Sequence, residues 1–309
     1  MVWFEWQLAT RFLKEGKTQT LLIASGIALG VAVIVFITTL VTGLQRTIID
    51  RTLGTQAHIV LTQPDKELLA SVNGEQVFRQ TQPRPQRIEP ILNWQLIEQK
   101  VKADTQIKAV SPVLSGAAFA LRGQADKSVA ILGINPDDYI RIIPLNNYLK
   151  QGQLRLNSDE AMIGTRLADD LGVRVGDSLN LLTATNRQVS VRITGIFEFG
   201  IKDLDRRWVY LSLRSAQNLL DLQGQITGMD LQVYSLFDAE KIAQQLQQQY
   251  PIKAESWMSS NQQLMTALRS QTASTTLIRF FVLISVAFGI ASVLAIAVVQ
   301  KQKEIGILR

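Results

Sequence analysis

Near the N-terminus stands Leu21-Leu-Ile-Ala-Ser-Gly-Ile-Ala-Leu-Gly-Val-Ala-Val-Ile-Val-Phe-Ile-Thr-Thr-Leu-Val41, part of a run that has no charged side chain. This run extends from Thr18 to Gln45. A second run of this kind extends from Phe280 to Gln300. Because roughly 20 helical residues cross a hydrocarbon core of about 30 Å, each run is long enough to span a bilayer. The two runs predict a membrane protein with two transmembrane α-helices, residues 18–45 and 280–300.

The composition excludes several classes of protein. The 309 residues include no cysteine, which excludes disulfides, thiolate metal sites and a cysteine nucleophile. His58 is the single histidine, so sites with several histidines are excluded, and we expect His58 in a strand after the first membrane helix. The net charge of +6 could indicate nucleic-acid binding, but the cations form no run and no recognition motif accompanies them. We therefore predict no nucleic-acid partner.

Residues 1–17 precede the first run and mix aromatic with basic residues. This composition is typical of an amphipathic helix that lies in the headgroup layer. A cleaved signal peptide would have an apolar region of only about 7–15 residues, followed by a small-residue cleavage site. We therefore predict an interfacial segment and an uncleaved first membrane helix.

Lysine and arginine are distributed unevenly around the two runs. Six lie near the membrane ends outside the pair of runs, and four lie near the ends between them. This excess favours a cytoplasmic location for both termini. The whole stretch from Arg46 to Arg279 would then lie outside the cytoplasm.

Both runs carry small residues on one face, which lets helices approach one another closely. We expect helix–helix contacts at Gly26 and Gly30 in the first run and at Ala287, Ala291 and Ala295 in the second. No ionisable residue lies inside either run, which argues against a proton relay through these helices.

Residues 46–258 predict an α+β domain outside the cytoplasm, with helices where apolar residues recur at helical spacing and strands in short runs bounded by Gly or Pro. Helices are expected at residues 89–103, 165–171, 214–222 and 238–250, and a proline-containing loop at 64–90. Strands are expected at residues 57–61, 107–114, 117–122, 128–134, 178–182, 188–199, 208–211 and 229–234.

Residues 259–279 predict a stalk. Neither Pro nor Gly occurs between Pro251 and Gly289, so one unbroken helix is expected from Ser259 through Gln300. Its length would be roughly 63 Å, about twice the hydrocarbon thickness. The second membrane helix is therefore expected to project outward as a rigid stalk and to continue inward into residues 301–309.

Motifs for catalysis are absent from the sequence or incomplete. Gly16-Lys17-Thr18 resembles the end of a phosphate-binding loop, but the first glycine of that motif would fall at Arg11 and no strand precedes it. We predict that the chain has no ATPase activity of its own. Trp257 is expected to be a packing anchor. Acidic pairs beside turns are expected to cap amides or face water: Asp137-Asp138, Asp169-Asp170, and Asp203 with Asp205.

Several stretches resemble one family of membrane proteins. They are Ala130-Ile-Leu-Gly-Ile-Asn-Pro-Asp-Asp-Tyr139, Ile163-Gly-Thr-Arg-Leu-Ala168, Leu171-Gly-Val-Arg-Val-Gly-Asp177, Ile193-Thr-Gly-Ile-Phe-Glu198 and Lys301-Gln-Lys-Glu-Ile-Gly-Ile-Leu-Arg309. Together with the order of span, large insert and span, they resemble the FtsX-like ABC transporter permeases of the MacB and LolC/LolE kind. The resemblance is closest to the lipoprotein-releasing LolC/LolE branch.

The resemblance implies a mechanotransmission permease in the bacterial inner membrane, with a MacB-type core domain in the periplasm. A separate cytoplasmic ATPase would hold ATP and Mg²⁺, and this chain would bind no cofactor. The coupling segment that contacts the ATPase would be Glu304, Ile305, Gly306, Ile307, Leu308 and Arg309. Other implied partners are a second permease copy or paralogue, a lipoprotein or amphiphile substrate, a periplasmic carrier and membrane lipid. Because the family has two further membrane helices, the resemblance also implies a chain truncated at Arg309.

Three other functions are open at this point. The first is MacB-like efflux of small amphiphiles or peptides through a membrane-fusion partner. The second is a two-span sensor, although a sensor should continue into a cytoplasmic signalling helix. The third is an FtsX-type regulator of cell-wall hydrolases, which would be expected to have a smaller outer domain. No residue can be assigned as a substrate ligand from the sequence.

Overall fold

The computed structural model describes residues 17–64 and 89–300. The chain divides into a helical unit, Met1–Asp50 with Gln262–Arg309, and an α/β unit, Arg51–Asn261. Three predicted features lie wholly or mostly outside the described residues: the interfacial segment 1–17, the loop at 64–90 and the coupling segment within 301–309.

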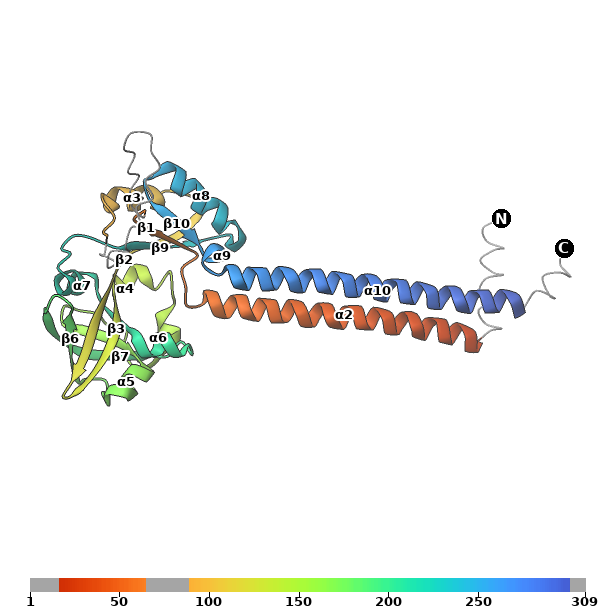
Figure 1. Ribbon diagram of the computed structural model, residues 1–309, viewed down its shortest axis with the longest axis horizontal. Helices are drawn as coiled ribbons and strands as arrows, with labels where there is room; N and C mark the ends of the chain where they lie inside the picture. The colour runs from red at the N-terminus through yellow and green to blue at the C-terminus, as the bar shows by residue number, and fades with distance from the viewer. Residues whose placement is uncertain (1–16, 65–88, 301–309) are drawn as a thin grey trace, which may run out of the picture. The chain divides into compact units, whose positions relative to one another are not determined.

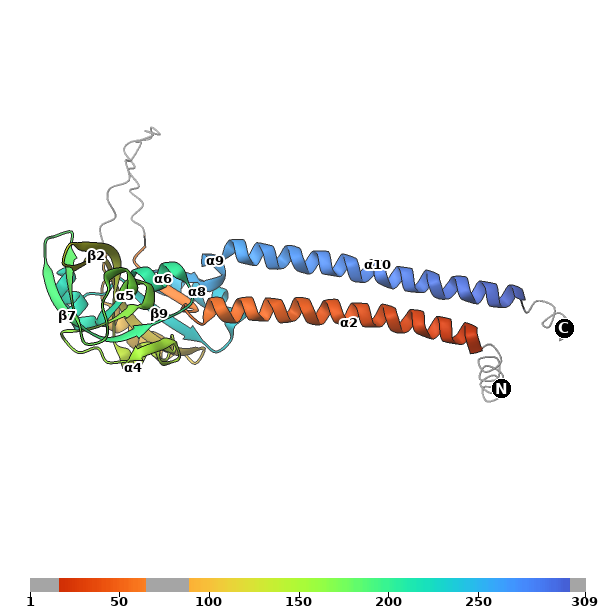
Figure 2. The ribbon, with the colours of Figure 1, turned by 90° about the horizontal axis from the view of Figure 1, so that it is seen from below.

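The helical unit consists of α2 (Lys17–Leu53), which continues a few residues into the α/β unit, and α10 (Gln262–Gln300). The two helices run side by side in both views (Figures 1 and 2). They contain segments long and apolar enough to cross a membrane, Ala24–Ile49 and Gln262–Ile296. Both predicted charge-free runs lie within these helices.

The second long helix begins later than the sequence predicts. A short helix, α9 (Trp257–Ser260), ends where Asn261 adopts φ −115° and ψ 42°, outside helical geometry. The Asn261 side-chain amide donates to the Trp257 carbonyl at 2.8 Å, which caps α9. The expected continuous helix from Ser259 is therefore wrong at its start, because α10 begins only at Gln262.

The α/β unit contains a four-stranded antiparallel layer in the order β10-β1-β9-β2. Its strands are β1 (Ile59–Thr62), β2 (Ile107–Arg122), β9 (Gly228–Val233) and β10 (Lys253–Ser256). Helix α3 (Trp94–Lys102) connects β1 to β2, and α8 (Ala239–Gln249) connects β9 to β10. Two strand–helix–strand units interleaved in this order form a ferredoxin-like layer.

Six strands close into a barrel beside this layer. They are the second half of β2 with β3 (Ala125–Ile134), β8 (Trp208–Ser212), β5 (Glu160–Gly164), β7 (Gln188–Phe197) and β6 (Ser178–Thr183), which pairs back to β2. Strand β4 (Leu149–Gly152) pairs with the far end of β7. Closure leaves these six strands with few free edges.

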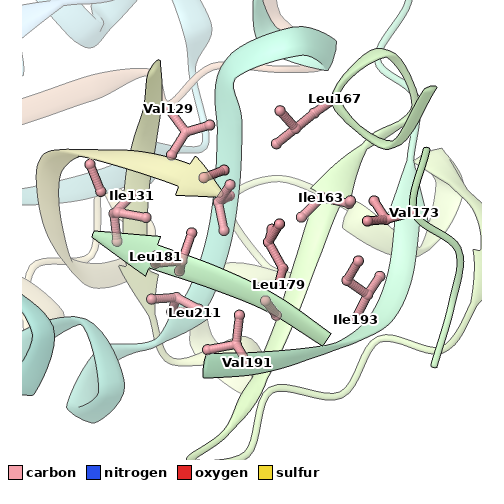
Figure 3. Packing of buried hydrophobic residues seen from close by; sticks show 14 of the residues in the cluster. Val129, Ile131, Ile163, Leu167, Val173, Leu179, Leu181, Val191, Ile193 and Leu211 are labelled. Atoms are coloured by element: carbon pink, nitrogen blue, oxygen red, sulfur yellow. The ribbon is translucent and has the colours of Figure 1, made fainter. Parts of the chain in front are cut away.

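The barrel interior is filled by alternate residues of its strands, because successive side chains of a strand point to opposite faces. Val129, Ile131, Leu179, Leu181 and Val191 are at most 1% exposed and point toward one another (Figure 3). Helices α5 (Thr165–Leu171) and α7 (Leu213–Leu220) contribute further apolar residues to the same cluster: Leu167, Ala168, Leu171, Ala216 and Leu219.

The remaining short elements contact different parts of the α/β unit. They are α4 (Pro136–Tyr139), the 3-10 helix η1 (Leu145–Tyr148), α6 (Lys202–Arg207) and the 3-10 helix η2 (Leu236–Asp238). Helix α6 lies against α5, β3 and β5, and η2 lies against α8. Residues around α4 and η1 form a second apolar cluster with the outer side of the barrel, including Tyr139, Ile142, Phe197 and Tyr210. This cluster joins the two parts of the α/β unit into one body.

Candidate functional site

Helices α2 and α10 contact each other at Gly30. A Cβ atom built on Gly30 would overlap with the Cγ2 atom of Val286, so the absence of a side chain allows the helices to approach. Gln45 Nε2 donates to Thr272 Oγ1 at 3.4 Å further along the pair. These two contacts set an antiparallel register in which residue numbers of facing positions sum to about 316 or 317.

The other predicted packing residues do not meet in this helix pair. A Cβ atom on Gly26 would have no heavy atom within 4 Å. Ala287, Ala291 and Ala295 are exposed on α10. Within the described chain, only Gly30 of the five is at the helix contact, and contacts of the other four with further helices stay a prediction.

One face of α2 forms an open apolar groove. Eight residues between positions 24 and 39 line it, from Ala24 through Val31 to Thr39, and its volume is about 950 Å³. All eight side chains are uncharged, so the groove offers contacts to acyl chains or to apolar helix faces but none to ions.

Arg279 is the one cation of α10 that the register places beside the apolar part of α2. By that register it faces Ile37 and Thr38, within the charge-free run. Its side chain is half-buried, and its Nε atom is shielded from solvent with no hydrogen-bond partner among the described residues. From the sequence alone Arg279 is only a cation that flanks the second charge-free run, because its neighbours on α2 depend on the register between the two helices.

The acidic pairs have structural roles. Asp205 is 2% exposed and its carboxylate accepts hydrogen bonds from the Phe199 and Gly200 amides at 2.7 and 3.1 Å, so it caps amides as predicted. Asp138 accepts from the Asn135 side chain at 2.9 Å. Asp170 forms ion pairs with Arg206 at 3.2 Å and Lys127 at 3.8 Å.

Metal ligands do not gather among these acids. In residues 17–64 and 89–300, no group of three or more His, Asp or Glu side chains is placed to hold a metal ion.

His58 and Trp257 lie at the end of the α/β unit where the chain enters and leaves it. His58 directly precedes β1 instead of lying within it, and its Nδ1 atom accepts from the Val233 amide at 3.2 Å. Burial lowers the pKa of His58. Trp257 is 2% exposed and its Nε1 donates to the Leu236 carbonyl at 3.0 Å. The predicted role of Trp257 as a packing anchor is confirmed.

Asp230 and two tyrosines form a polar group inside the α/β unit that the sequence pattern does not predict. Asp230 lies on β9 between Val60 and Ser111 of the neighbouring strands. Burial raises its pKa to about 7. Burial also raises the pKa of Tyr139 and of Tyr210, whose ring centroids are 5.9 Å apart. The Met-Asp-Leu-Gln-Val alternation of β9 is typical of a strand with one solvated face, but residues that follow α4 cover that face, as the hydrogen bond from Gln232 to the Ile142 carbonyl shows.

The predicted ATPase contact, Glu304, Ile305, Gly306, Ile307, Leu308 and Arg309, lies outside the described residues. The described residues comprise the helix pair and the α/β unit, and the role of the coupling segment stays a prediction from its sequence.

Comparison with known proteins identifies the family. The MacB-like periplasmic core domain family matches residues 20–249. LolE of Haemophilus influenzae, a lipoprotein-releasing system transmembrane protein, is 27% identical over 300 residues, which cover 93% of this chain and 67% of LolE. LolC of Xylella fastidiosa, of the same system name, is 25% identical over 298 residues, which cover 92% of this chain and 66% of LolC. The chain thus spans about two thirds of the length of these relatives.

Two solved structures are more distant. The periplasmic region of MacB from Actinobacillus actinomycetemcomitans is 13% identical with a TM-score of 0.46, over 70% of this chain and 95% of that chain. The extracellular domain of the ABC-type transporter YknZ from Gram-positive bacteria is 13% identical with a TM-score of 0.44, over 65% and 100%. Because the family match covers well over half of the 309 residues, and the relatives are LolE and LolC, the chain belongs to the MacB and LolC/LolE family of permeases.

Proposed function

We propose that this chain is the permease subunit of a mechanotransmission ABC transporter that releases lipoproteins at the outer face of the bacterial inner membrane. A separate cytoplasmic ATPase would hydrolyse ATP, and this chain would transmit the resulting motion. The observation that carries the proposal is the pair of helices α2 and α10. They are antiparallel, each is long enough to span a membrane, and in the sequence one precedes and the other follows the α/β unit. The names of LolE and LolC support lipoprotein as the substrate.

The proposed topology places both termini in the cytoplasm and the α/β unit in the periplasm. It rests on the excess of Lys and Arg at those ends of the two charge-free runs that lie nearer the chain termini. The part of α10 from Gln262 to Arg279 precedes its charge-free run. At 1.5 Å per residue this part adds about 27 Å of helix beyond the hydrocarbon, which is long enough to act as a stalk.

In the proposed mechanism, α10 transmits motion from the coupling segment to the α/β unit. ATP binding to the ATPase would move Glu304–Arg309 and with it the cytoplasmic end of α10. A continuous helix transmits displacement along its axis because each of its turns is hydrogen-bonded to the next. The open apolar face of α2 would let acyl chains of a substrate enter from the bilayer between two permease copies.

The first test is purification of the native protein from its own membranes, with identification of the chains that co-purify. We expect an ABC ATPase, a second permease and a lipoprotein. Recovery of a membrane-fusion protein in place of lipoprotein would favour efflux, and recovery of a kinase without an ATPase would contradict a transporter and favour a sensor.

A second test addresses the ATPase contact directly. Ile305→Asn with Leu308→Asn removes two apolar side chains of the coupling segment, and we expect at least a tenfold loss of co-purifying ATPase. Gln302→Asn, in the same segment, is the matched control and should retain the ATPase. Equal recovery from both variants would contradict the assignment of Glu304–Arg309 as the contact.

A further inference from the structure

Arg279 marks one end of the charge-free run of α10. The run extends from Phe280 to Gln300, and Lys301 follows it. At 1.5 Å per residue the run is about 31 Å long, which equals the thickness of a typical hydrocarbon core. In the proposed topology, Arg279 therefore lies at the boundary between the outer leaflet's acyl chains and its headgroups.

Helix α2 presents apolar and uncharged residues beside this position. Its charge-free run is about 42 Å long, and the register places Arg279 beside Ile37 and Thr38. Beyond that level, toward the α/β end of α2, Leu40 and Leu44 are 60% and 50% exposed. Apolar side chains thus flank the guanidinium on both sides of its level, where the local dielectric constant is low.

The helix pair supplies no counterion for Arg279. The described helices α2 and α10 contain one acidic residue, Asp50, which lies about 18 Å along the axis from Thr38. The Nε atom of Arg279 is shielded from solvent and has no acceptor among the described residues. Charged side chains at membrane depth are usually paired, and the described part of the helix pair gives Arg279 no anion to pair with.

Phosphate is the anion that a bilayer provides at this depth, and a guanidinium binds phosphate oxygens with two parallel N–H donors. We propose that Arg279 binds the phosphate of an outer-leaflet phospholipid and thereby fixes the depth of α10 in the membrane. The inference rests on the membrane crossing in the proposed function, and it assigns one residue and one headgroup chemistry to the contact with lipid.

The test measures where α10 leaves the bilayer. Because the chain has no native cysteine, single cysteines report their own position only. The full-length chain is reconstituted into phosphatidylcholine vesicles, and a membrane-impermeant maleimide is added outside. The labelled positions are exposed residues on both sides of Arg279: Ala273, Thr276, Leu277, Phe281 and Leu283.

We expect labelling at positions 273–277 and protection at 281 and 283. With Arg279→Gln, Leu277 and Ile278 can enter the acyl region, so protection should extend by about one helical turn to Thr276 and Leu277. Digalactosyl diacylglycerol vesicles have no phosphate and the same zero net charge as phosphatidylcholine, and they should shift the unsubstituted chain in the same way. Arg269→Gln, at an exposed cation earlier in α10, should leave the boundary unchanged.

Each contrary outcome has a distinct meaning. A boundary that moves with neither Arg279→Gln nor the loss of lipid phosphate would overturn the Arg279 assignment and leave the membrane crossing intact. Restoration of the boundary by inorganic phosphate in galactolipid vesicles would assign the site to free phosphate and overturn the lipid assignment. Equal labelling at all five positions would overturn the membrane crossing and this inference with it.

Discussion

Asp230 is a carboxyl group whose charge is controlled by the segment that covers its strand. The neighbouring polar residue on the same face, Gln232, donates to the Ile142 carbonyl at 2.6 Å, which shows that residues after α4 lie over this face. Burial raises the Asp230 pKa to about 7 from an ordinary value of 3.8. The folded chain therefore holds a proton there that the unfolded chain releases above about pH 4.

This shift predicts a pH dependence of stability. The contribution of Asp230 is fully present below pH 4 and is lost as pH rises through 7, because the charged form is disfavoured in the folded state. Asp230→Asn should therefore raise the free energy of unfolding at pH 8 by about 1–2 kcal/mol, a value at the low end because Asp230 keeps partial solvent contact. Urea unfolding of the full chain in detergent, followed by circular dichroism between pH 5 and 8, measures the change.

Asp126→Asn, at an exposed position in the β2–β3 hairpin, is the control and should leave the pH profile unaltered. A gain from Asp230→Asn that is equal at pH 5 and pH 8 would show that the substitution acts by packing and not by titration.

Two glycines of the barrel differ in what surrounds them. A Cβ atom on Gly164 would collide with the backbone oxygen of Asp205, whereas one on Gly116 would lie 2.5 Å from the end of the Leu220 side chain. A backbone atom cannot yield without moving α6, but a leucine methyl group can change rotamer. We expect Gly164→Ala to lower the free energy of unfolding by about 2–3 kcal/mol, and Gly116→Ala by less than about 1 kcal/mol. Equal losses in urea unfolding would contradict this distinction.

At the scale of the element, the α2–α10 pair depends on one glycine. Gly30→Val should separate the helices near Val286, and Gly26→Val should not, because no heavy atom lies within 4 Å of a Cβ at Gly26. Gln45→Cys with Thr272→Cys places one thiol on each helix at a hydrogen-bonded pair in a chain without other cysteines. We expect the yield of a short bis-maleimide cross-link to fall at least threefold with Gly30→Val.

Val286→Ala removes the methyl groups that a side chain at position 30 would contact. It should therefore restore part of the cross-linking in the Gly30→Val chain. Loss of cross-linking with Gly26→Val to the same degree would contradict the assignment of Gly30 as the contact.

Periodicity predicted most of the longer elements and missed those that tertiary contacts create. Helix α8 was predicted because Ile242, Ala243 and Leu246 recur on one face, and these residues are buried. Strand β5 was missed because Glu160–Gly164 is short and is held by pairing with the distant strands β7 and β8. Strand β2 was predicted as two strands interrupted at Gly116, yet Gly116 continues the ladder opposite Ile131.

The features of the candidate site likewise fall into those that the local sequence predicts and those that depend on tertiary contacts. The two long apolar helices could be predicted because a long absence of charge is a local property of the sequence. The role of Gly30 and the position of Arg279 could not, because both depend on the register between α2 and α10. The proton on Asp230 depends likewise on coverage by residues around Ile142, which are far from it in the sequence.

At the scale of the whole molecule, the proposed function requires that α10 and the α/β unit move together. Asn261 is the last residue of the α/β unit, and its side chain donates to Gln56 Oε1 at 3.2 Å as well as to the Trp257 carbonyl. It thus holds the incoming and outgoing connections of the unit together. A flexible insertion directly after Asn261 preserves the hydrogen bonds of Asn261. It removes the rigid connection between Asn261 and α10.

Insertion of Gly-Gly-Ser-Gly after Asn261 should therefore leave the α/β unit folded and the ATPase of the complete transporter active, while lipoprotein release falls at least tenfold. The control places the same insertion after Gly123, in the tight turn between β2 and β3, where release should be unchanged. Release is measured from spheroplasts, ATP hydrolysis on the purified complex, and folding by circular dichroism. Normal release with a flexible joint after Asn261 would show that α10 does not transmit the motion, because a flexible Gly/Ser segment cannot carry an axial displacement of a helix.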